Sequence, residues 1–305
     1  RIYDKAADCD ILIGSYHLVR NDIQKLQDLD LSLVILDEAQ MIKNPSAKIT
    51  RAVKTLRSGK RLALSGTPIE NRLADLWSIF DYLNPGFLGE LSHFTDAYEN
   101  SPHNRRELAA RVKPLILRRT KEKVARELPA RTVEVIRCTM SDGQRTLYNE
   151  QMQMAKKKAA AGNFSIFAAL TRLRQVCCDP RLLKDGLSSE VASAKLKCLL
   201  DMLEPIIEEG HSVLVFSQFT SMLEIIESEL AKMKLKSFKL TGDIPTVKRP
   251  ALVKQFNDEK EASVFLLSLK AAGTGLTLTK ADYVFIFDPW WNPAAEQQAI
   301  DRAHR

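Results

Sequence analysis

The sequence predicts an α/β protein made of two parallel-sheet units, each carrying a helical insertion. Short apolar runs that end on polar or Gly-rich residues alternate with amphipathic helical patterns in both halves of the chain. Near-continuous aliphatic runs of this kind are typical of strands buried on both faces of a parallel sheet. Two stretches, about 72–112 and about 141–185, carry helical patterns without such runs. The alternation predicts doubly wound sheets, and the interruptions predict the insertions.

Five runs are predicted to be strands, because each has an apolar body and a polar or Gly-containing end. They are residues 31–40, 61–68, 211–218, 263–275 and 283–289. Helical patterns cover 193–210, from a Ser start to a Gly stop, and 220–233. Ser141 and Gln144 have the spacing of a capping box, which predicts the start of another helix.

A charged connector separates two further predicted strands, residues 114–120 and 131–140. A chain of 305 residues is long enough for two domains with separate cores. The first residues have the character of mid-domain sequence and no apolar signal segment, which predicts a first lobe truncated at its amino terminus. The predicted parts are the rest of that lobe at 1–122 with an insertion at about 72–112, the connector 123–131, and a second lobe at 132–305 with an insertion at about 141–185.

The composition is typical of a globular protein, with 45% hydrophobic and 27% charged residues. No apolar run reaches the roughly 18–20 residues that cross a bilayer. The five cysteines are scattered without metal-ligand spacing and are interpreted as reduced thiols. The net charge of +7 favours a polyanionic partner. Nine Lys and Arg residues lie between 105 and 126, where they form either a solvated face or a nucleic-acid contact, and the sequence leaves both open.

Asp37 and Glu38 end the apolar run 33–36 with two adjacent carboxylates. Ligands of open parallel sheets bind beyond the carboxyl ends of the strands, so this run is predicted to be a buried strand that holds both side chains at a ligand. Mg²⁺ prefers carboxylates, waters and substrate phosphates, and it would compensate the repelling pair. Glu38 would then orient or deprotonate an attacking water. The alternative is an ordinary strand end with two solvated acids.

Two other segments supply groups suited to phosphate chemistry. Ser65 and Thr67 flank a glycine at the end of the next predicted strand, in the sequence SGTPIEN. Near the carboxyl terminus, Arg302 and Arg305 are three residues apart and share one helix face. Two guanidinium groups so placed can clamp phosphates or stabilise a transferring γ-phosphoryl group. Taken singly, such a turn or such an arginine pair is more often an ordinary surface feature.

In this order, the motifs closely resemble those of the SWI/SNF-type ATPases, the double-stranded-DNA translocases of the helicase superfamily. The resemblance covers essentially the whole chain, and the third motif and the last block are its most specific parts. The matching segments are DEAQ (37–40), LSGTPIENRLADLWSIFDYLNPGFLG (64–89), LILRRTKEKV (115–124), VLVFSQFT (213–220), LTG (240–242), SLKAAGTGLTLTKAD (268–282) and DPWWNPAAEQQAIDRAHR (288–305).

The resemblance implies two RecA-like lobes with helical protrusions, which bind ATP and Mg²⁺ in the cleft between them and move along duplex DNA as ATP is hydrolysed. It also implies roles for residues of the first lobe. Asp37 would hold Mg²⁺ through water, and Glu38 would activate the hydrolytic water. Ser65 and Thr67, together with Gln40, would couple the nucleotide to the DNA path.

For the second lobe, the resemblance implies that Arg302 and Arg305 act as arginine fingers, ordered at the nucleotide by Gln298 and Asp301. A surface that tracks the DNA backbone would contain Ser268, Lys270, Gly273, Gly275, Trp290 and Trp291. The two glycines are also assigned to the nucleotide. We expect at least one of the paired tryptophans, Trp291, to project from the rim of the lobe, because an acidic residue precedes the pair and a proline breaks the chain after it.

Four features depart from the family pattern. Gln40 stands where many members carry His, which is expected to weaken the link between the catalytic carboxylates and the third motif. Lys270 replaces a frequent Arg and loses its bidentate fork, and Ala272 replaces a frequent Gly. The chain contains no G-x-x-x-x-G-K-[ST] phosphate loop, which in the family lies ahead of residue 1. The chain alone is therefore expected to be inactive as an ATPase.

The predicted function of the complete protein is ATP-dependent translocation on double-stranded DNA, with remodelling or displacement of a DNA-bound protein. A strand-separating helicase and a non-hydrolysing module that binds DNA or protein are the two alternatives. The identity of the displaced protein and the direction of movement stay open. We expect a monomer without membrane attachment, located in the cytoplasm with the nucleoid if the protein is bacterial and in the nucleus if it is eukaryotic.

Overall fold

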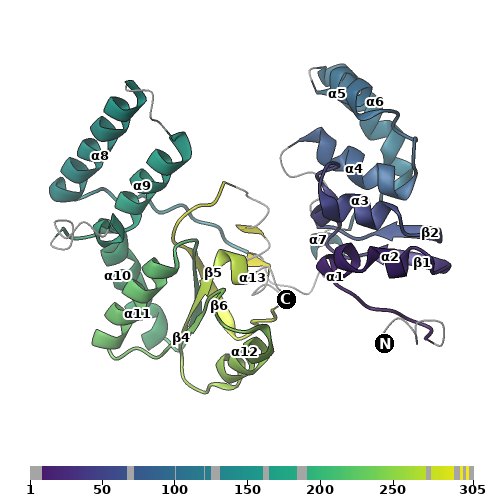
Figure 1. The fold of residues 1–305 in the computed structure, drawn as a ribbon. Helices are drawn as coiled ribbons and strands as arrows, with labels where there is room; N and C mark the ends of the chain where they lie inside the picture. The colour runs from purple at the N-terminus through teal and green to yellow at the C-terminus, as the bar shows by residue number, and fades with distance from the viewer. Residues whose placement is uncertain are drawn as a thin grey trace. The chain divides into compact units, whose positions relative to one another are not determined.

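The computed structural model shows two compact units, residues 1–120 and 121–305, which Figure 1 draws from purple to blue and from teal to yellow. The structure describes residues 9–66, 72–99, 101–119, 121–124, 131–160, 165–183, 191–272, 276–291, 296–297 and 300–301. Every strand pair in these ranges is parallel, in a two-stranded sheet in the first unit and a four-stranded sheet in the second. The predicted class, α/β with parallel sheets and helical insertions, is confirmed.

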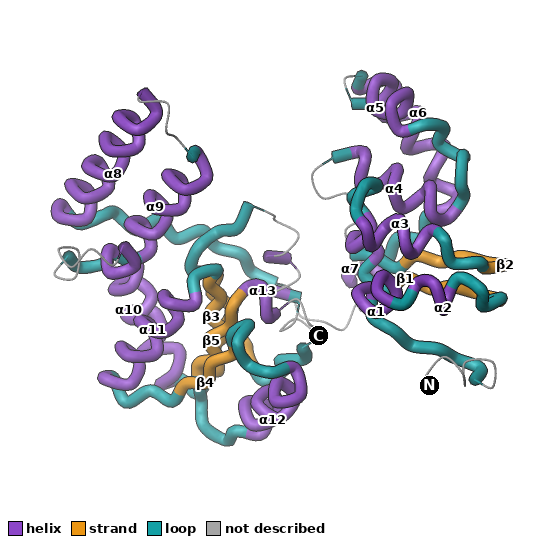
Figure 2. The backbone as a smooth tube through the Cα atoms, in the orientation of Figure 1, coloured by secondary structure: helices purple, strands orange, loops and turns teal. Residues whose placement is uncertain are grey.

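The first unit packs helices against its small sheet, as the tube in Figure 2 shows. Its elements are α1 (Tyr16–Asn21), α2 (Ile23–Leu26), β1 (Leu31–Leu36), η2 (Ala39–Ile42), α3 (Lys48–Lys54), β2 (Ser58–Ala63), α4 (Leu73–Leu83), α5 (Leu91–Tyr98), α6 (Pro102–Val112) and η3 (Lys113–Leu115). One apolar core joins β1 to α3 and α4 through Leu36, Val53 and Ile79. A second core holds α4, α5 and α6 together around Phe80, Phe94 and Leu108. The helical insertion is thus fixed to the sheet by a shared helix, α4.

The strand β1 is only half buried, so the predicted buried strand is wrong in this respect. Leu36 is buried, but Leu33 and Ile35 are about half exposed. Side chains alternate between the two faces of a strand, and Leu33 and Ile35 share the face opposite to the α3 and α4 core. On β2, Leu62 is likewise exposed. Among the described residues, β1 pairs only with β2 and nothing covers this second face, which explains the exposure.

The second unit has a central sheet of order β4-β5-β3-β6 with helices on both faces. Its elements are α7 (Lys121–Val124), α8 (Asp142–Ala160), α9 (Ile166–Cys178), η4 (Pro180–Leu183), α10 (Ala194–Glu208), β3 (Ser212–Ser217), α11 (Thr220–Lys232), β4 (Ser237–Leu240), η6 (Thr246–Lys248), α12 (Arg249–Asp258), β5 (Val264–Ser268), α13 (Leu269–Ala272) and β6 (Ala281–Ile286). Val213 and Val264 pack against α10 and α11. Phe216 and Phe265 point to the other face and pack against Phe256 of α12. Every residue of β3 and β5 is buried, as the continuous apolar runs predict.

Two predicted strands are absent from the described structure. Residues 114–119 form the end of η3 and an irregular segment, and residues 131–140 are also irregular. Val133 and Val135, which favoured the strand prediction, are 66% and 80% exposed. β-Branched residues favour strands only where a neighbouring edge and a packed face receive them, and in the described residues these segments meet neither. The short edge strand β4, by contrast, was not predicted.

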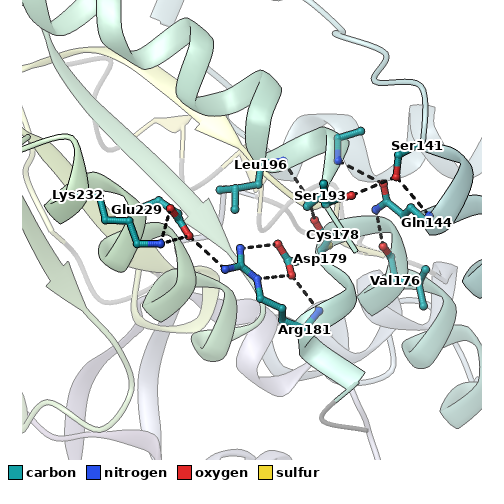
Figure 3. Close-up of polar contacts among 12 residues, drawn as sticks. Ser141, Gln144, Val176, Cys178, Asp179, Arg181, Ser193, Leu196, Glu229 and Lys232 are labelled. Atoms are coloured by element: carbon teal, nitrogen blue, oxygen red, sulfur yellow. Dashed lines mark hydrogen bonds and ion pairs between the residues drawn. The ribbon is translucent and has the colours of Figure 1, made fainter. Parts of the chain in front are cut away.

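A set of polar groups, of which Gln144, Asp179 and Ser193 are buried, connects the insertion α8–α9 to the helices that cover the sheet (Figure 3). Ser141 caps α8 by accepting a hydrogen bond from Gln144 N at 3.3 Å. The Gln144 side chain does not complete the predicted capping box; its Nε2 donates to Val176 O of α9 at 2.7 Å instead. That carbonyl is buried and requires a donor, which explains the difference. Ser193 Oγ accepts from Leu196 N at 3.1 Å and donates to Cys178 O at 2.6 Å, so it caps α10 and holds the end of α9.

In the same region, an arginine pairs with a buried carboxylate and also reaches α11. Asp179 is fully buried and accepts two hydrogen bonds from the Arg181 guanidinium, at 2.9 and 3.0 Å. Arg181 also donates to Glu229 of α11 at 3.2 Å (Figure 3). Hydrogen bonds from Lys232 and Arg181 hold the pKa of the Glu229 carboxyl below its usual range. We call these residues (Ser141, Gln144, Asp179, Arg181, Ser193 and Glu229) the polar seam.

Ser193→Ala is expected to lower the free energy of unfolding by about 1–3 kcal/mol, because it removes a helix cap and leaves the buried Cys178 carbonyl without its donor. Ser165→Ala is the matched control. Ser165 caps α9 in the same way, accepting from Ala168 N, but it is exposed, so water replaces the lost bond at a smaller cost. Urea unfolding followed by circular dichroism measures both, and equal losses would contradict the role of Ser193 in the polar seam.

Candidate functional site

The acidic end of β1 forms a turn whose backbone is hydrogen-bonded to the residue that follows β2. Leu64 N donates to Leu36 O and Ala39 N donates to Leu64 O, both at 2.8 Å, so pairing continues past the two strands. Between these bonds, Glu38 adopts φ 50° and ψ 52°, the left-handed conformation that residues with a side chain rarely take. Leu64 thus pairs with both Leu36 and Ala39, which makes the segment around Glu38 a bulge in the parallel pairing, and the Glu38 side chain contacts Gln40, two residues later.

Glu38, Gln40 and Ser65 form one continuous hydrogen-bond chain. Gln40 Nε2 donates to Glu38 Oε2 at 2.6 Å, and Ser65 Oγ donates to Gln40 Oε1 at 2.8 Å. The sequence predicts that glutamine weakens this link, but the structure shows the link intact. An amide has a donor and an acceptor at one end of the side chain, so it can bridge the carboxylate and the hydroxyl together. The carboxylate end of β1 is thus connected to the first residue of the SGTPIEN motif.

Asp37 lies next to this chain with its carboxylate exposed. Its Oδ1 accepts a hydrogen bond from Glu38 N at 2.9 Å, which fixes the side chain over the turn. Tyr16 of α1 donates its hydroxyl to the Asp37 carbonyl at 2.7 Å. Burial, and secondarily the charge of Asp37, raise the pKa of the Tyr16 hydroxyl, so it remains a donor. The sequence pattern does not single out Tyr16, which is a helix residue 21 positions before its partner.

The second cluster lies at the carboxyl ends of β3, β5 and β6. Trp290 packs partly against the apolar core, whereas Trp291 is 64% exposed, so Trp291 projects as the sequence predicts. Ser268 ends β5, but it is buried, and its Oγ accepts a hydrogen bond from Ala271 N at 3.3 Å. This places Ser268 in the cap of α13 and not on the surface, so we do not propose a direct DNA contact through its hydroxyl.

Three residues before Trp291 lies a buried carboxylate, Asp288, which is 2% exposed. It accepts hydrogen bonds from Gln218 N, the shorter at 3.1 Å, and Arg174 Nη2 lies 4.0 Å from its Oδ2. Burial raises the pKa of the Asp288 carboxyl to about 6, against the lowering effect of its hydrogen bonds and of Arg174. Arg174 was not predicted from the sequence, because it comes from α9, more than 100 residues before this loop.

The other predicted site residues lie mostly outside the described residues. Asp301 is described, and its Oδ1 accepts a hydrogen bond from Gln297 Nε2 at 3.2 Å. In the basic run, Arg105 and Arg111 donate to backbone carbonyls of their own unit, the latter to Phe87 O, which gives both a structural role. The predicted residues outside the described ranges are Thr67, Gly273, Gly275, Gln298, Arg302 and Arg305, together with the side chain of Lys270.

Two negative observations apply to the described residues. They contain no group of three or more His, Cys, Asp or Glu side chains able to hold a metal ion by themselves. In the same ranges, no helix combines the length and the apolar character that crossing a membrane requires.

An acidic strand end in one parallel-sheet unit and an exposed indole at the strand ends of the other are the arrangement expected of a helicase-superfamily protein, and two family models that match the chain confirm this class. A model of the SNF2-related domain matches residues 2–182, and one of the helicase conserved C-terminal domain matches residues 194–305. The chain belongs to the SNF2-related family. The resemblance to SWI/SNF-type ATPases is confirmed.

Similar proteins come from several kingdoms. An uncharacterized ATP-dependent helicase of Mycoplasma genitalium is 36% identical over 97% of this chain and 29% of its own length. The TATA-binding protein-associated factor mot1 of Schizosaccharomyces pombe is 33% identical over the whole chain and 19% of its own length. The Sulfolobus solfataricus SWI2/SNF2 ATPase core in complex with double-stranded DNA is 33% identical, with a TM-score of 0.51 over 98% of this chain and 65% of that one. The chain thus spans less than a third of the length of these two curated relatives.

The raised pKa of Asp288 predicts a pH dependence of stability. Between roughly pH 4 and pH 6, the Asp288 carboxyl is protonated in the folded state and ionised in the unfolded state. The stability contributed by the protonated carboxyl is therefore fully present below this window and is lost as the pH rises through about 6. The free energy of unfolding of the wild type, relative to Asp288→Asn, should fall by up to about 3 kcal/mol across the window. Urea unfolding of both proteins at several pH values tests this, and a constant difference would contradict it.

Proposed function

We propose that the complete protein containing this chain is an ATP-driven translocase that moves along double-stranded DNA and displaces or remodels proteins bound to it. The observation that carries the proposal is the hydrogen-bond chain from Glu38 through Gln40 to Ser65. It joins the acidic strand end to the third motif, in a chain whose family includes ATP-dependent helicases. Because the chain covers only part of its relatives, the activity is proposed for the complete protein.

Asp37 has the chemistry required to hold Mg²⁺. Its carboxylate is exposed, one oxygen is oriented by Glu38 N, and the other makes no hydrogen bond within the described residues. A hard oxygen ligand of this kind suits Mg²⁺ bound through water. The ion would supply charge neutralisation at the nucleotide phosphates. Glu38, fixed by Gln40, would take a proton from the attacking water.

Roles for the carboxyl-terminal residues rest on the family membership. Arg302 and Arg305 are proposed to stabilise charge on the transferring phosphoryl group, the role of arginine fingers in phosphoryl transfer. Gln298 and Asp301 are proposed to order them. Gly273 and Gly275 are proposed to let the backbone approach the nucleotide and the DNA.

Coupling between ATP and DNA is proposed to pass through the hydrogen-bond chain. A shift of Ser65, together with Thr67 two residues later in the sequence, moves the hydroxyl that donates to Gln40 and so changes the position of Glu38. The loop after β2 and the carboxylate after β1 therefore respond to each other without any large rearrangement.

The DNA contact is proposed to involve Trp291 and Lys270 on the second unit. An exposed indole in the loop that follows β6 is suited to contact with sugar or base edges, and Lys270 would neutralise phosphate. The likeness to a SWI2/SNF2 core solved with double-stranded DNA supports the duplex as the substrate. The similarity to a TATA-binding protein-associated factor supports a DNA-bound protein as the displaced partner.

A strand-separating helicase is the second candidate, favoured by the names of relatives that are called ATP-dependent helicases. The third candidate, a non-hydrolysing binding module, describes the chain in isolation, because its 305 residues contain no G-x-x-x-x-G-K-[ST] loop. We therefore propose that this chain alone does not turn over ATP.

Glu38→Gln in the full-length protein is expected to abolish ATP turnover while nucleotide binding persists, because it removes the proton acceptor.

Gln40→Ala is expected to lower DNA-stimulated turnover by about 10- to 100-fold, since Glu38 loses its donor and Ser65 its acceptor. Gln40→His should keep more activity. Gln24→Ala, an exposed position on α2, is the control. Steady-state ATPase assays with and without DNA test these expectations. Normal turnover in Gln40→Ala would show that the hydrogen-bond chain has no role in the mechanism.

Turnover by the full-length protein is expected to be stimulated more by duplex than by single-stranded DNA, without unwinding of a forked duplex. Trp291→Ala should reduce the ratio of duplex-stimulated to basal turnover and stop translocation. Phe167→Ala is the matched control, because Phe167 is an exposed aromatic residue elsewhere on the same unit. Strand separation, or equal stimulation by single strands, would favour the helicase.

A further inference from the structure

The side chain of Arg174 joins helix α9 to the two segments that leave the sheet after β3 and β6. Its Nη1 donates to Gln218 Oε1 at 3.0 Å, and its Nη2 donates to the carbonyl of Pro289. The guanidinium lies over the exposed Trp291 ring, 5.1 Å from the centroid. One planar group thus contacts both ends of the short loop 288–291.

We propose that Arg174 is a positioning residue, which clamps the loop 288–291 to α9 and thereby holds Trp291 in the orientation that contacts duplex DNA. The inference rests on the proposed role of Trp291 and extends it: the helical insertion, and not the sheet alone, sets where the indole points.

Helix α9 can serve as a fixed anchor because the polar seam holds its end. Val176 O accepts from Gln144, and Cys178 O accepts from Ser193, within the network drawn in Figure 3. Cys178 itself lies in the apolar core and is 1% exposed. Arg174 precedes these anchored residues by about half a turn to one turn, so its backbone shares their rigidity.

Trp291, in contrast, has little packing of its own. The ring is 64% exposed, whereas the neighbouring Trp290 packs partly against the core. A side chain so exposed is ordered mainly by the few groups that touch it. The guanidinium covers one face of the ring and also holds the carbonyl two residues earlier, so it restrains the side chain and the backbone together.

The surroundings of Arg174 are not those of an arrangement built for stability. Asp288 is buried, yet the guanidinium stays 4.0 Å from it and gives its hydrogen bonds to Gln218 and Pro289. Gln218 Nε2 is buried without a hydrogen-bond partner among the described residues. Burying a carboxylate and an unpaired amide is costly, and an apolar set of the same shape is often at least as stable. The polar arrangement is explained by the direction it imposes on the loop.

Lysine is not equivalent to arginine at this position. The flat guanidinium stacks on the indole while its nitrogens donate in two directions, whereas an ammonium is a compact, strongly hydrated charge that stacks less well. Arg172 provides an internal comparison, because it lies on the same helix and donates to Gln151 of α8 at 3.0 Å, within the insertion.

The clamp is tested first without DNA. Trp77→Phe and Trp290→Phe leave Trp291 as the only indole of the chain, since the sequence has three tryptophans. In this background, Arg174→Lys and Arg174→Gln should raise the acrylamide quenching of Trp291, whereas Arg172→Lys should not. Hydrogen exchange of residues 287–291 in the chain with all tryptophans present gives the same test if the substituted background folds poorly. Unchanged quenching and unchanged exchange would overturn the clamp.

The second arm measures duplex-stimulated ATPase of the full-length protein. Loss of a stacking cation of this kind corresponds to about a 2- to 5-fold change in the population of the clamped loop. The duplex concentration for half-maximal stimulation should rise by a similar factor in Arg174→Lys and stay unchanged in Arg172→Lys. If Arg174→Lys raises the quenching of Trp291 without weakening the response of the ATPase to duplex, the positioning role of Arg174 is contradicted, whereas the proposed function is not. If Trp291→Ala leaves the duplex response intact, the proposed DNA contact itself fails.

Discussion

The left-handed turn at Glu38 is the constraint on which the site of the first unit depends. A residue with a side chain adopts this conformation at a cost on the order of 1–2 kcal/mol. Two backbone hydrogen bonds to the end of β2 and the hydroxyl of Tyr16 on the Asp37 carbonyl hold it in place. Because the backbone of Glu38 is left-handed, the two adjacent carboxylates do not follow the regular alternation of an extended strand, and they make different contacts. Asp37 stays at the surface, and Glu38 is directed to Gln40 and onward to Ser65.

The second unit also holds polar groups at the carboxyl end of a parallel sheet, but there the packing of the sheet keeps them in place. Its strands β3 and β5 are buried on both faces, so their ends are rigid without help from a strained turn. The loop with the tryptophans follows β6, which pairs with β3, and there Trp291 is exposed while its neighbour Trp290 packs partly against the core. The first unit has a half-exposed strand and relies on hydrogen bonds in the turn. Rigidity at the two sites therefore has two sources.

The sequence predicts a feature of this structure when the residues that cause it are close together along the chain. The apolar runs predict β3 and β5, because a strand that is buried on both faces has apolar side chains at consecutive positions. The short β4, of sequence SFKL, contains a lysine and lacks such a run, and residues 131–140 have β-branched side chains but no edge to pair with among the described residues. Acidic, hydroxyl and indole residues of the sites are visible as local motifs. Tyr16 and Arg174 are not, because each acts on a residue that only the fold brings near: 21 positions away for Tyr16 and 115 for Arg174.

The insertion α8–α9 is tied to the rest of the second unit by contacts with the helices that cover the sheet and with the loop after β6. The polar seam fixes the carboxyl end of α9 to α10 and α11, and Arg174 fixes the same end to the loop after β6. A displacement of α9 therefore strains two sets of contacts at its carboxyl end. It must either break the buried hydrogen bonds of the seam, which costs several kcal/mol in total, or move the loop that carries Trp291. The second route requires only small shifts of groups that are already polar and partly unpaired, such as Gln218. With the clamp proposed above, a displacement of α9 would therefore change the orientation of the Trp291 indole.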